Sequence, residues 1–360
     1  MTTALDRPAT VRRYAVPGMP RPVRVMALCV SMSLILTAGV VTALCLGEVV
    51  LAPGEVLAAL TGTADGATTL IVTEFRLPRV LAGVLAGACL AAAGTLLQSV
   101  LRNPLASPDV VGVSHGASAG AVLSLAAGIP ATMVPLGALA GAALAAGALV
   151  VLGWRGGLAG ERIVLIGIGL SAVLTAVVTW AVVAFPVTVA QQALLWTIGS
   201  LFGRTWEEVG WAGLGAVVLL PVAMAQSSRL AVLELGDDLA HGLGLPAGKA
   251  RLGLLATAVG LAGSAVALGG PITFVALGVP HLARALAGPP RPTAPTAGTL
   301  LLCSLVGAAL VVYADLIAGS AMARPVPVGV VTATLGAPWF CWVLVRGARA
   351  ERPAVERRRS

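Results

Sequence analysis

The sequence predicts an all-α, polytopic integral membrane protein that crosses the bilayer about ten times as helices. Of its 360 residues, 58% are hydrophobic and 11% are charged, whereas a soluble domain carries roughly 25% charged residues. The mean hydropathy is +0.96. The apolar residues also cluster into long runs without Asp, Glu, Lys or Arg, and a helix needs about 20 such residues to cross the hydrocarbon core. Because a charge at mid-bilayer costs about 2.5 to 3.5 kcal/mol, these runs mark the spans.

Several of the charge-free runs are too long for one crossing. The runs are 25–47, 80–101, 110–154, 163–203, 209–228, 252–283, 292–314 and 325–345. Turn signals at Gly128-Ile129-Pro130 and at Gly269-Gly270-Pro271 each divide a run into two spans, the second reaching from Pro271 to about Ala287. Run 163–203 supplies one span up to Phe185-Pro186. Its remainder, 189–200, is too short to cross and is predicted to be a surface helix.

The first run is interpreted as a span and not as a secretion signal. The run from Val25 to Gly47 is 23 residues long, which exceeds the apolar core of a signal, and Ala43-Leu44-Cys45 lacks the small-residue cleavage pattern. The predicted organisation is a disordered cytoplasmic tail at 1–24, a transmembrane domain at 25–346 that includes an inner loop at 229–251, and a basic cytoplasmic tail at 347–360.

The distribution of basic residues orients the spans, because Arg and Lys accumulate on the cytoplasmic side. With both termini inside, only four of the 23 basic residues fall outside: Arg76, Arg79, Arg204 and Arg324. The net charge of +8 therefore reflects topology. Nucleic-acid binding is not expected, because the basic residues do not gather on one face.

Catalytic and metal-binding patterns are absent from the sequence. His115, His241 and His281 have no metal-ligand spacing with Cys, Asp or Glu, and the five cysteines are expected to be small buried hydrophobic residues. The segment Gly244–Ala250 resembles a phosphate-binding loop, but Leu243 and Ala250 stand where glycine and Ser or Thr are required. We therefore expect neither an enzyme, nor a bound metal, nor a nucleotide bound by this chain.

The longest inner loop, from Gln226 to Arg251, contains a distinctive segment. Residues 233–244 are predicted to form a short amphipathic helix that opens with Asp237 and Asp238 and ends in glycines, since acids suit a helix N-terminus. Such a helix on the cytoplasmic face could dock into another protein. The alternative is an ordinary solvated loop.

Several motifs carry a resemblance to a known family. They are Arg76-Leu-Pro-Arg79, Gly94-Thr-Leu-Leu-Gln98, Asn103-Pro-Leu-Ala106-Ser-Pro-Asp109, Gly112-Val-Ser-His-Gly116-Ala117, Leu235 to Gly244, Gly270 to Arg284, and Pro327 to Pro338. In this order they resemble the FecCD-type membrane permeases of bacterial iron-siderophore, haem and cobalamin importers, which belong to the type II ATP-binding-cassette class. The motifs extend over about residues 70 to 345.

The resemblance implies partners and residue roles. A second permease copy or a paralogue would complete a dimer, two cytoplasmic ATPase subunits would use ATP and Mg, and a soluble binding protein would deliver substrate from outside. The implied ATPase-coupling residues are Leu235, Gly236, Asp237, Asp238, Ala240, Gly242, Leu243 and Gly244. Asn103, Pro104 and Leu105 would form the cytoplasmic gate. Arg76, Arg79 and Arg324 would dock the binding protein, while His281 and Arg284 match the family without a derived role and are expected to pack or to contact lipid.

One segment departs from the family pattern. Before the last span the family shows an arginine and then Glu-Leu-Pro, where this chain reads Asp315-Leu-Ile-Ala-Gly-Ser320 and Arg324-Pro-Val-Pro327. The resulting hypothesis is a permease subunit in the plasma membrane of a bacterium, importing ferric siderophores. Cobalamin or haem import, a secondary transporter without an ATPase, and a membrane scaffold without transport are the alternatives.

Overall fold

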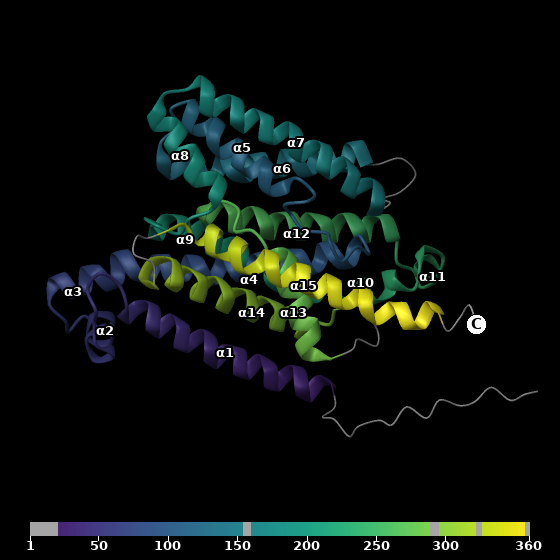
Figure 1. Cartoon of the computed structure of the whole chain (residues 1–360), viewed down its shortest axis with the longest axis horizontal. Coiled ribbons are helices and arrows are strands. Elements are labelled where there is room, and N and C mark those ends of the chain that lie inside the picture. The colour runs from purple at the N-terminus through teal and green to yellow at the C-terminus, as the bar shows by residue number, and fades with distance from the viewer. Residues whose placement is uncertain (1–20, 154–159, 289–294, 322–325, 357–360) are drawn as a thin grey trace, which may run out of the picture.

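The computed structural model describes residues 21–153, 160–288, 295–321 and 326–356. Within these ranges every regular element is a helix, and the long helices lie side by side along one axis (Figure 1). Seven helices or continuous helical stretches are long and apolar enough to cross a membrane. The predicted fold class, an all-α polytopic membrane protein, is confirmed.

The helices follow one another along the chain with short connections. They are α1 (Arg21–Cys45), α2 (Pro53–Leu60), α3 (Gly66–Leu70), a π-helical turn (Ile71–Arg76), α4 (Leu77–Val100), α5 (Val113–Ala126), a 3₁₀ turn (Ala131–Met133), α6 (Val134–Gly153), α7 (Gly160–Ala184), α8 (Val187–Ile198), α9 (Trp206–Ala225), α10 (Ser227–Glu234), α11 (Asp237–Gly242), α12 (Ala247–Gly269), α13 (Val275–Ala287), α14 (Ala297–Leu316), a second π-helical turn (Ile317–Ala321) and α15 (Val328–Glu356).

Helix α4 is the centre of the bundle. It packs against α9, α12, α13 and α14. In an apolar 18-residue part of the helical stretch Gly66–Val100, which ends with α4, 83% is buried inside the bundle, against 17% in the corresponding parts of α1 and α7. Glycines permit this packing: a Cβ on Gly87 would lie 2.2 Å from the carbonyl oxygen of Gly307 in α14, and one on Gly94 would lie 1.8 Å from that of Ala276 in α13. Small residues at such crossings let helix backbones approach where lipid supplies no hydrophobic drive.

Three predicted spans are shorter than a membrane crossing. Helix α5 has 14 residues, α13 has 13, and the described apolar part of α15 runs from Val328 to Trp342. At 1.5 Å per residue, α5 and α13 are each about 20 Å long, less than the roughly 30 Å hydrocarbon core. The expected total of about ten is therefore reached only if these shorter helices are counted with the seven longer ones.

A stretch of non-helical backbone precedes each of the two short helices. Residues 101–112 lead into α5 and bury Ala106 and Ser107, while residues 270–274 lead into α13 and bury Ile272. Irregular backbone at membrane depth is tolerated where surrounding protein covers it. The sequence indicated both breaks, by the charged residues Arg102 and Asp109 between two runs and by the turn signal Gly269-Gly270-Pro271. It did not show that the helices after them begin only at Val113 and Val275.

Further details differ from the sequence-based expectations. The predicted surface helix at 189–200 is α8, whose Ala193 is buried against Val122 of α5 and Ala181 of α7. The prediction that all five cysteines are buried is wrong for Cys341, which is exposed, and Cys29 is only partly buried.

Helices α2 and α3 were not predicted. Their capping signals were present, because Glu55 accepts a hydrogen bond from the amide of Ala52 and Asp65 accepts one from Thr68.

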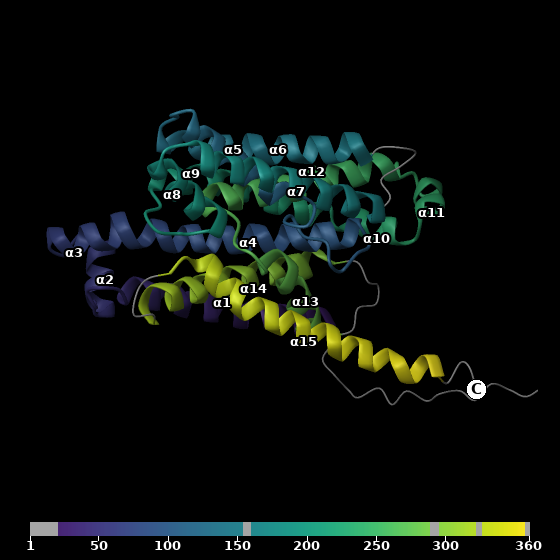
Figure 2. The same ribbon diagram turned by 45° about the horizontal axis from the view of Figure 1, so that its top comes forward.

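The bundle has two distinct ends, which are named here after their helices. The α3 end carries α2 and α3, and the α11 end carries α10 and α11 (Figures 1 and 2). The start of α1 and the end of α15 both point toward the α11 end. The two ends of the described chain therefore lie on the same side of the bundle, as an even number of crossings requires.

Candidate functional site

The predicted docking arginine Arg79 is held by an ion pair at the α3 end. Its Nε and Nη2 donate to the two carboxylate oxygens of Asp315 at 2.8 and 3.0 Å, which joins the start of α4 to the end of α14. The guanidinium carbon lies 3.9 Å from the ring centroid of Phe202. Both charged side chains are largely buried, at 24% and 12% exposed. Arg79 is thus a structural link in this conformation.

The second predicted docking arginine closes the end of α1. The Arg76 guanidinium donates to the carbonyls of Leu44 and Cys45 at 2.6 and 3.1 Å and to the carbonyl of Val49. A cation beside the last carbonyls of a helix is favourable because those oxygens lack partners within the helix. The third, Arg324, lies outside the described residues.

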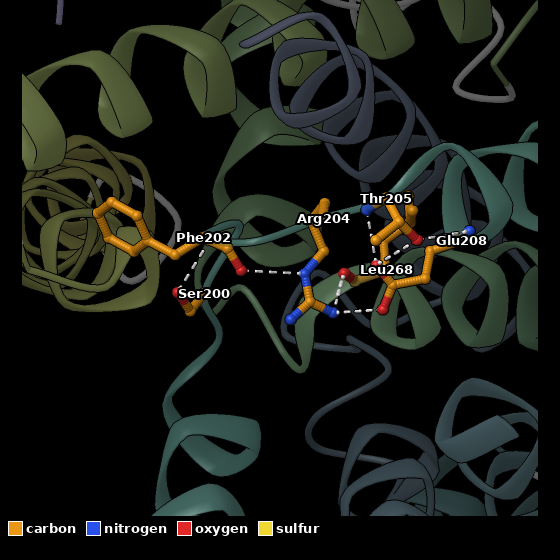
Figure 3. Close-up of polar contacts among 6 residues, drawn as sticks. All are labelled: Ser200, Phe202, Arg204, Thr205, Glu208 and Leu268. Atoms are coloured by element: carbon orange, nitrogen blue, oxygen red, sulfur yellow. Dashed lines mark hydrogen bonds and ion pairs between the residues drawn. The ribbon is translucent and has the colours of Figure 1, made fainter. Parts of the chain in front are cut away.

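Sequence reasoning missed a polar cluster around Arg204 between α8 and α9. Arg204 Nη1 donates to the carboxylate of Glu208 and to the carbonyl of Leu268, both at 2.9 Å, and its Nε donates to the carbonyl of Phe202 at 3.3 Å (Figure 3). Thr205 begins α9 with a capping box, in which its amide donates to Glu208 at 2.9 Å. The Thr205-Trp-Glu-Glu208 spacing was the available signal.

A cavity of about 520 Å³ lies beside this cluster. Its lining combines Arg204 and Glu208 with the aromatic side chains of Trp196 and Phe202. The Arg204 guanidinium lies 5.8 Å from the Trp196 ring centroid. The α3 end therefore offers a partly polar hollow whose charged groups are already paired with one another.

The predicted gate residues form a tight turn after α4. The side-chain oxygen of Asn103 accepts a hydrogen bond from the Leu105 amide at 2.9 Å, and its carbonyl accepts one from Ala106 at 3.1 Å. Leu105 is 44% exposed, whereas Ala106 is fully buried. Asn103 thus fixes a turn that presents Leu105 outward and anchors the following segment in the bundle.

The predicted coupling segment, Leu235 to Gly244, contains α11 and follows directly after α10. Helix α10 ends at Glu234, and the backbone turns at Gly236, which has φ +104° and so suits glycine. Asp237 and Asp238 occupy the first turn of α11, as predicted, but the single helix expected over 233–244 is broken at 235–236. The carboxylate of Asp237 accepts hydrogen bonds from Arg251 of α12 at 2.6 and 2.9 Å.

Helix α11 has one buried side and one apolar exposed side. Ala240 is fully buried against the bundle, while Leu235, Leu239 and Leu243 are 56%, 59% and 65% exposed. Residues four apart lie on one face of a helix. Leu239 and the C-cap residue Leu243 therefore share one exposed face of α11, while Leu235 lies exposed in the turn before the helix.

The motif residues His281 and Arg284 hold α13 against its neighbours. Arg284 donates to the Gln98 side-chain oxygen of α4 at 2.6 Å, and Gln98 donates to the carbonyl of Leu277 at 3.1 Å. The His281 ring meets Phe340 of α15 edge-on, with centroids 5.5 Å apart. Their contacts are consistent with the predicted packing role.

Metal-ligating side chains do not gather anywhere in the described ranges. Groups of three or more His, Cys, Asp or Glu that could hold a metal ion are absent there.

The fold and these sites define a multi-pass α-helical membrane protein. The chain belongs to the FecCD transport family, whose model matches residues 35–346. It is 40% identical over 323 residues to the achromobactin transport system permease protein CbrC of Dickeya dadantii, covering 88% of this chain and 91% of the relative. It is 39% identical over 305 residues to the ferric enterobactin transport system permease protein FepG of Escherichia coli, covering 84% and 91%.

A cobalamin system and a solved structure are also similar. The chain is 37% identical over 327 residues to the vitamin B12 import system permease protein BtuC of Salmonella agona, covering 89% of this chain and 95% of the relative. A structure described as an inward-facing conformation of a putative metal-chelate type ABC transporter matches with TM-score 0.77 and 25% identity, covering 89% of this chain and 99% of that one. The type II importer permease fold is confirmed.

Proposed function

We propose that this chain is the transmembrane permease subunit of an ATP-binding-cassette importer that takes up ferric siderophores across a bacterial plasma membrane. Membership of the FecCD transport family supports the class, and relatives named for achromobactin, ferric enterobactin and Fe(3+)-citrate transport support the substrate. Similarity to a vitamin B12 permease keeps cobalamin as the second candidate. Haem is a further alternative that the family resemblance leaves open.

The exposed leucines in and beside α11 are the main observation that supports this proposal. A short helix that buries Ala240 and has three leucines more than half exposed in and beside it suits docking into a groove on another protein. Because α11 lies at one tip of the bundle (Figure 1), an ATPase subunit is the proposed occupant. ATP and Mg would be bound by that subunit.

The remaining roles follow from this orientation. The α11 end is the proposed cytoplasmic side, which places both termini inside, and Asn103, Pro104 and Leu105 form the proposed gate on that side. The α3 end then faces the binding protein. Because Arg76 and Arg79 already have partners within the chain, docking through them requires the Arg79–Asp315 ion pair to open or a surface near it to be used instead.

The coupling role can be tested by reversing the charges at the start of α11. Replacing Asp237 and Asp238 with lysine should abolish ATP-driven uptake while leaving membrane insertion intact. Since Asp237 also pairs with Arg251, the triple variant Asp237→Lys, Asp238→Lys, Arg251→Asp is the control that restores an internal pair. If uptake is still lost in this triple variant, loss of the internal ion pair does not explain the defect, and the acids are assigned to ATPase docking. Uptake unchanged in the double variant would refute the coupling role.

The substrate is tested by growth of a deletion strain on single iron sources. Ferric citrate, a ferric hydroxamate, ferric enterobactin and haem are each supplied alone, and cobalamin is supplied to a cobalamin auxotroph. Loss of growth on one ferric siderophore, with restoration by the intact gene, supports the proposed class. Co-purification with an ATPase subunit separates an ATP-driven importer from a secondary transporter.

A further inference from the structure

Arg102 occupies a backbone conformation that arginine rarely adopts. Its φ is +49°, and it is one of two described non-glycine residues with positive φ. It follows Leu101, the C-cap residue of α4, and precedes the gate turn at Asn103. Left-handed backbone costs a residue with a Cβ more than it costs glycine.

The hydrogen bonds around Arg102 identify a Schellman motif at the end of α4. The amide of Asn103 donates to the carbonyl of Gln98 at 3.1 Å, and the amide of Arg102 donates to that of Ser99 at 3.3 Å. Glycine is the usual residue at the left-handed position of this motif. Backbone preference therefore does not explain an arginine here, and its side chain must be considered.

The Arg102 side chain reaches a different segment of the chain. Its guanidinium donates to the carbonyl of Leu233, in the last turn of α10, 131 positions further along the sequence. Cations are favourable beside the last carbonyls of a helix. The chain leaves α10 one residue after Leu233 and turns at Gly236 into α11.

The contact crosses the edge of a cavity of about 600 Å³. The lining includes Pro104 of the gate turn, Glu234 of α10 and Arg284 of α13. Open space thus lies between part of the gate turn and the end of α10. The Arg102 hydrogen bond spans this gap and connects two segments for which the proposed function requires concerted movement.

We propose that Arg102 is a positioning residue that transmits displacement of the ATPase-docking helix α11 to the gate turn, by holding the end of α10 through the Leu233 carbonyl. The inference rests on the proposed function. When an ATPase subunit moves α11, α10 moves with it, and Arg102 draws the adjoining residues 103–105 along. Without the side chain, ATP hydrolysis continues but moves the gate less often.

The test compares Arg102→Gly with Arg102→Lys in transporter reconstituted with its ATPase and binding protein. Glycine suits the left-handed backbone but lacks the donor, and lysine keeps a cationic donor. We expect Arg102→Gly to keep or raise the thermal unfolding midpoint, while substrate imported per ATP hydrolysed falls about tenfold, as for loss of a charged hydrogen bond. In Arg102→Lys the ratio should stay within about threefold of wild type. Arg229→Ala, an exposed arginine on α10 itself, is the matched control and should leave the ratio unchanged.

The outcomes separate the inference from the function on which it rests. The probe is whichever of ferric citrate, a ferric hydroxamate and ferric enterobactin the wild type imports. An unchanged ratio in Arg102→Gly would make Arg102 a helix cap and overturn the inference alone. Equal losses in the glycine and lysine variants would also overturn it. If the wild type hydrolysed no ATP in response to any probe, both the proposed function and the inference would fail.

Discussion

The α3 end and the α11 end of the bundle differ in which side chains they leave available for a partner. At the α3 end, Arg79 is paired with Asp315, Arg204 with Glu208, and Arg76 with carbonyls at the end of α1. At the α11 end, Leu235, Leu239 and Leu243 are more than half exposed. These arginines of the α3 end are satisfied within the chain, whereas these leucines of the α11 end have little cover among the described residues.

The difference indicates how strongly each end depends on a partner. Charged groups that are largely buried must be paired, because an unpaired buried charge is expensive. Exposed leucines at the tip of a membrane bundle gain stability only when another protein covers them. We infer that the α11 end forms the more permanent contact, and that the α3 end can exist alone between encounters.

The largest effect is expected when charged residues replace the exposed leucines in and beside α11. The double variant Leu235→Asp, Leu239→Asp should reduce retention of the ATPase subunit about tenfold or more, because central apolar anchors dominate interface energy. Retention is measured by co-purification in detergent at fixed protein concentration. Leu57→Asp is the matched control, since Leu57 on α2 is 63% exposed at the opposite end. Equal loss of retention in the control would remove the contrast between the two ends.

A smaller effect, on stability, is expected at the Arg79–Asp315 pair. Asp315→Ala should lower the free energy of unfolding by about 3 kcal/mol, because it leaves a largely buried guanidinium without its carboxylate. The exchange Arg79→Asp with Asp315→Arg should recover part of this loss. Unfolding is followed by thermal denaturation in detergent.

The same pair separates a structural role from a docking role. If Arg79 meets an acid on the binding protein, Arg79→Ala should weaken binding-protein affinity while Asp315→Ala should not, because the arginine is then released. Equal weakening by both variants would show that the pair acts only by holding α4 to α14. Affinity is measured by surface binding to reconstituted transporter.

The smallest effect is expected at the cap of α3. Hydrogen bonds from the side chain and amide of Thr68 hold the pKa of Asp65 below its usual value of 3.8. A lowered folded-state pKa means that this cap contributes stability above pH 3.8 and loses it as pH falls through the folded pKa. The exchange protection of the Thr68 amide, corrected for its intrinsic rate, should therefore decrease between pH 6 and pH 3. In Asp65→Ser, which keeps a neutral cap, protection should not change with pH; a parallel decrease there would contradict the assignment.

Local patterns predicted most of the long helices because crossing a membrane is a requirement on local length and polarity. The runs that became α1, α4, α7, α9 and α14 are apolar over about 20 residues, and no other part of the chain is needed to recognise them. The acids at the start of α11 were likewise recognised, since helix N-termini favour negative charge. The short helices α5 and α13 were expected to be full spans, because a charge-free run shows where apolar sequence extends and not where the helix within it begins.

Interaction partners were less predictable than helices. Arg79 and Asp315 are 236 positions apart in the chain, so the sequence around one residue gives no indication that the other is its partner. The same holds for Arg102 and Leu233, and for Arg284 and Gln98. The exposed leucines in and beside α11 were predicted only in part, because the sequence indicated an amphipathic segment without showing which side Ala240 would bury.

The amino-acid sequence by itself determined the membrane class, the approximate spans and the family, since these depend on apolar length and on short motifs read in order. Only the tertiary structure decided which arginines are already paired, where the backbone breaks within the bundle, and which face of α11 points outward. Those properties arise from contacts between segments that are distant in the chain, and such contacts form only when the helices have packed.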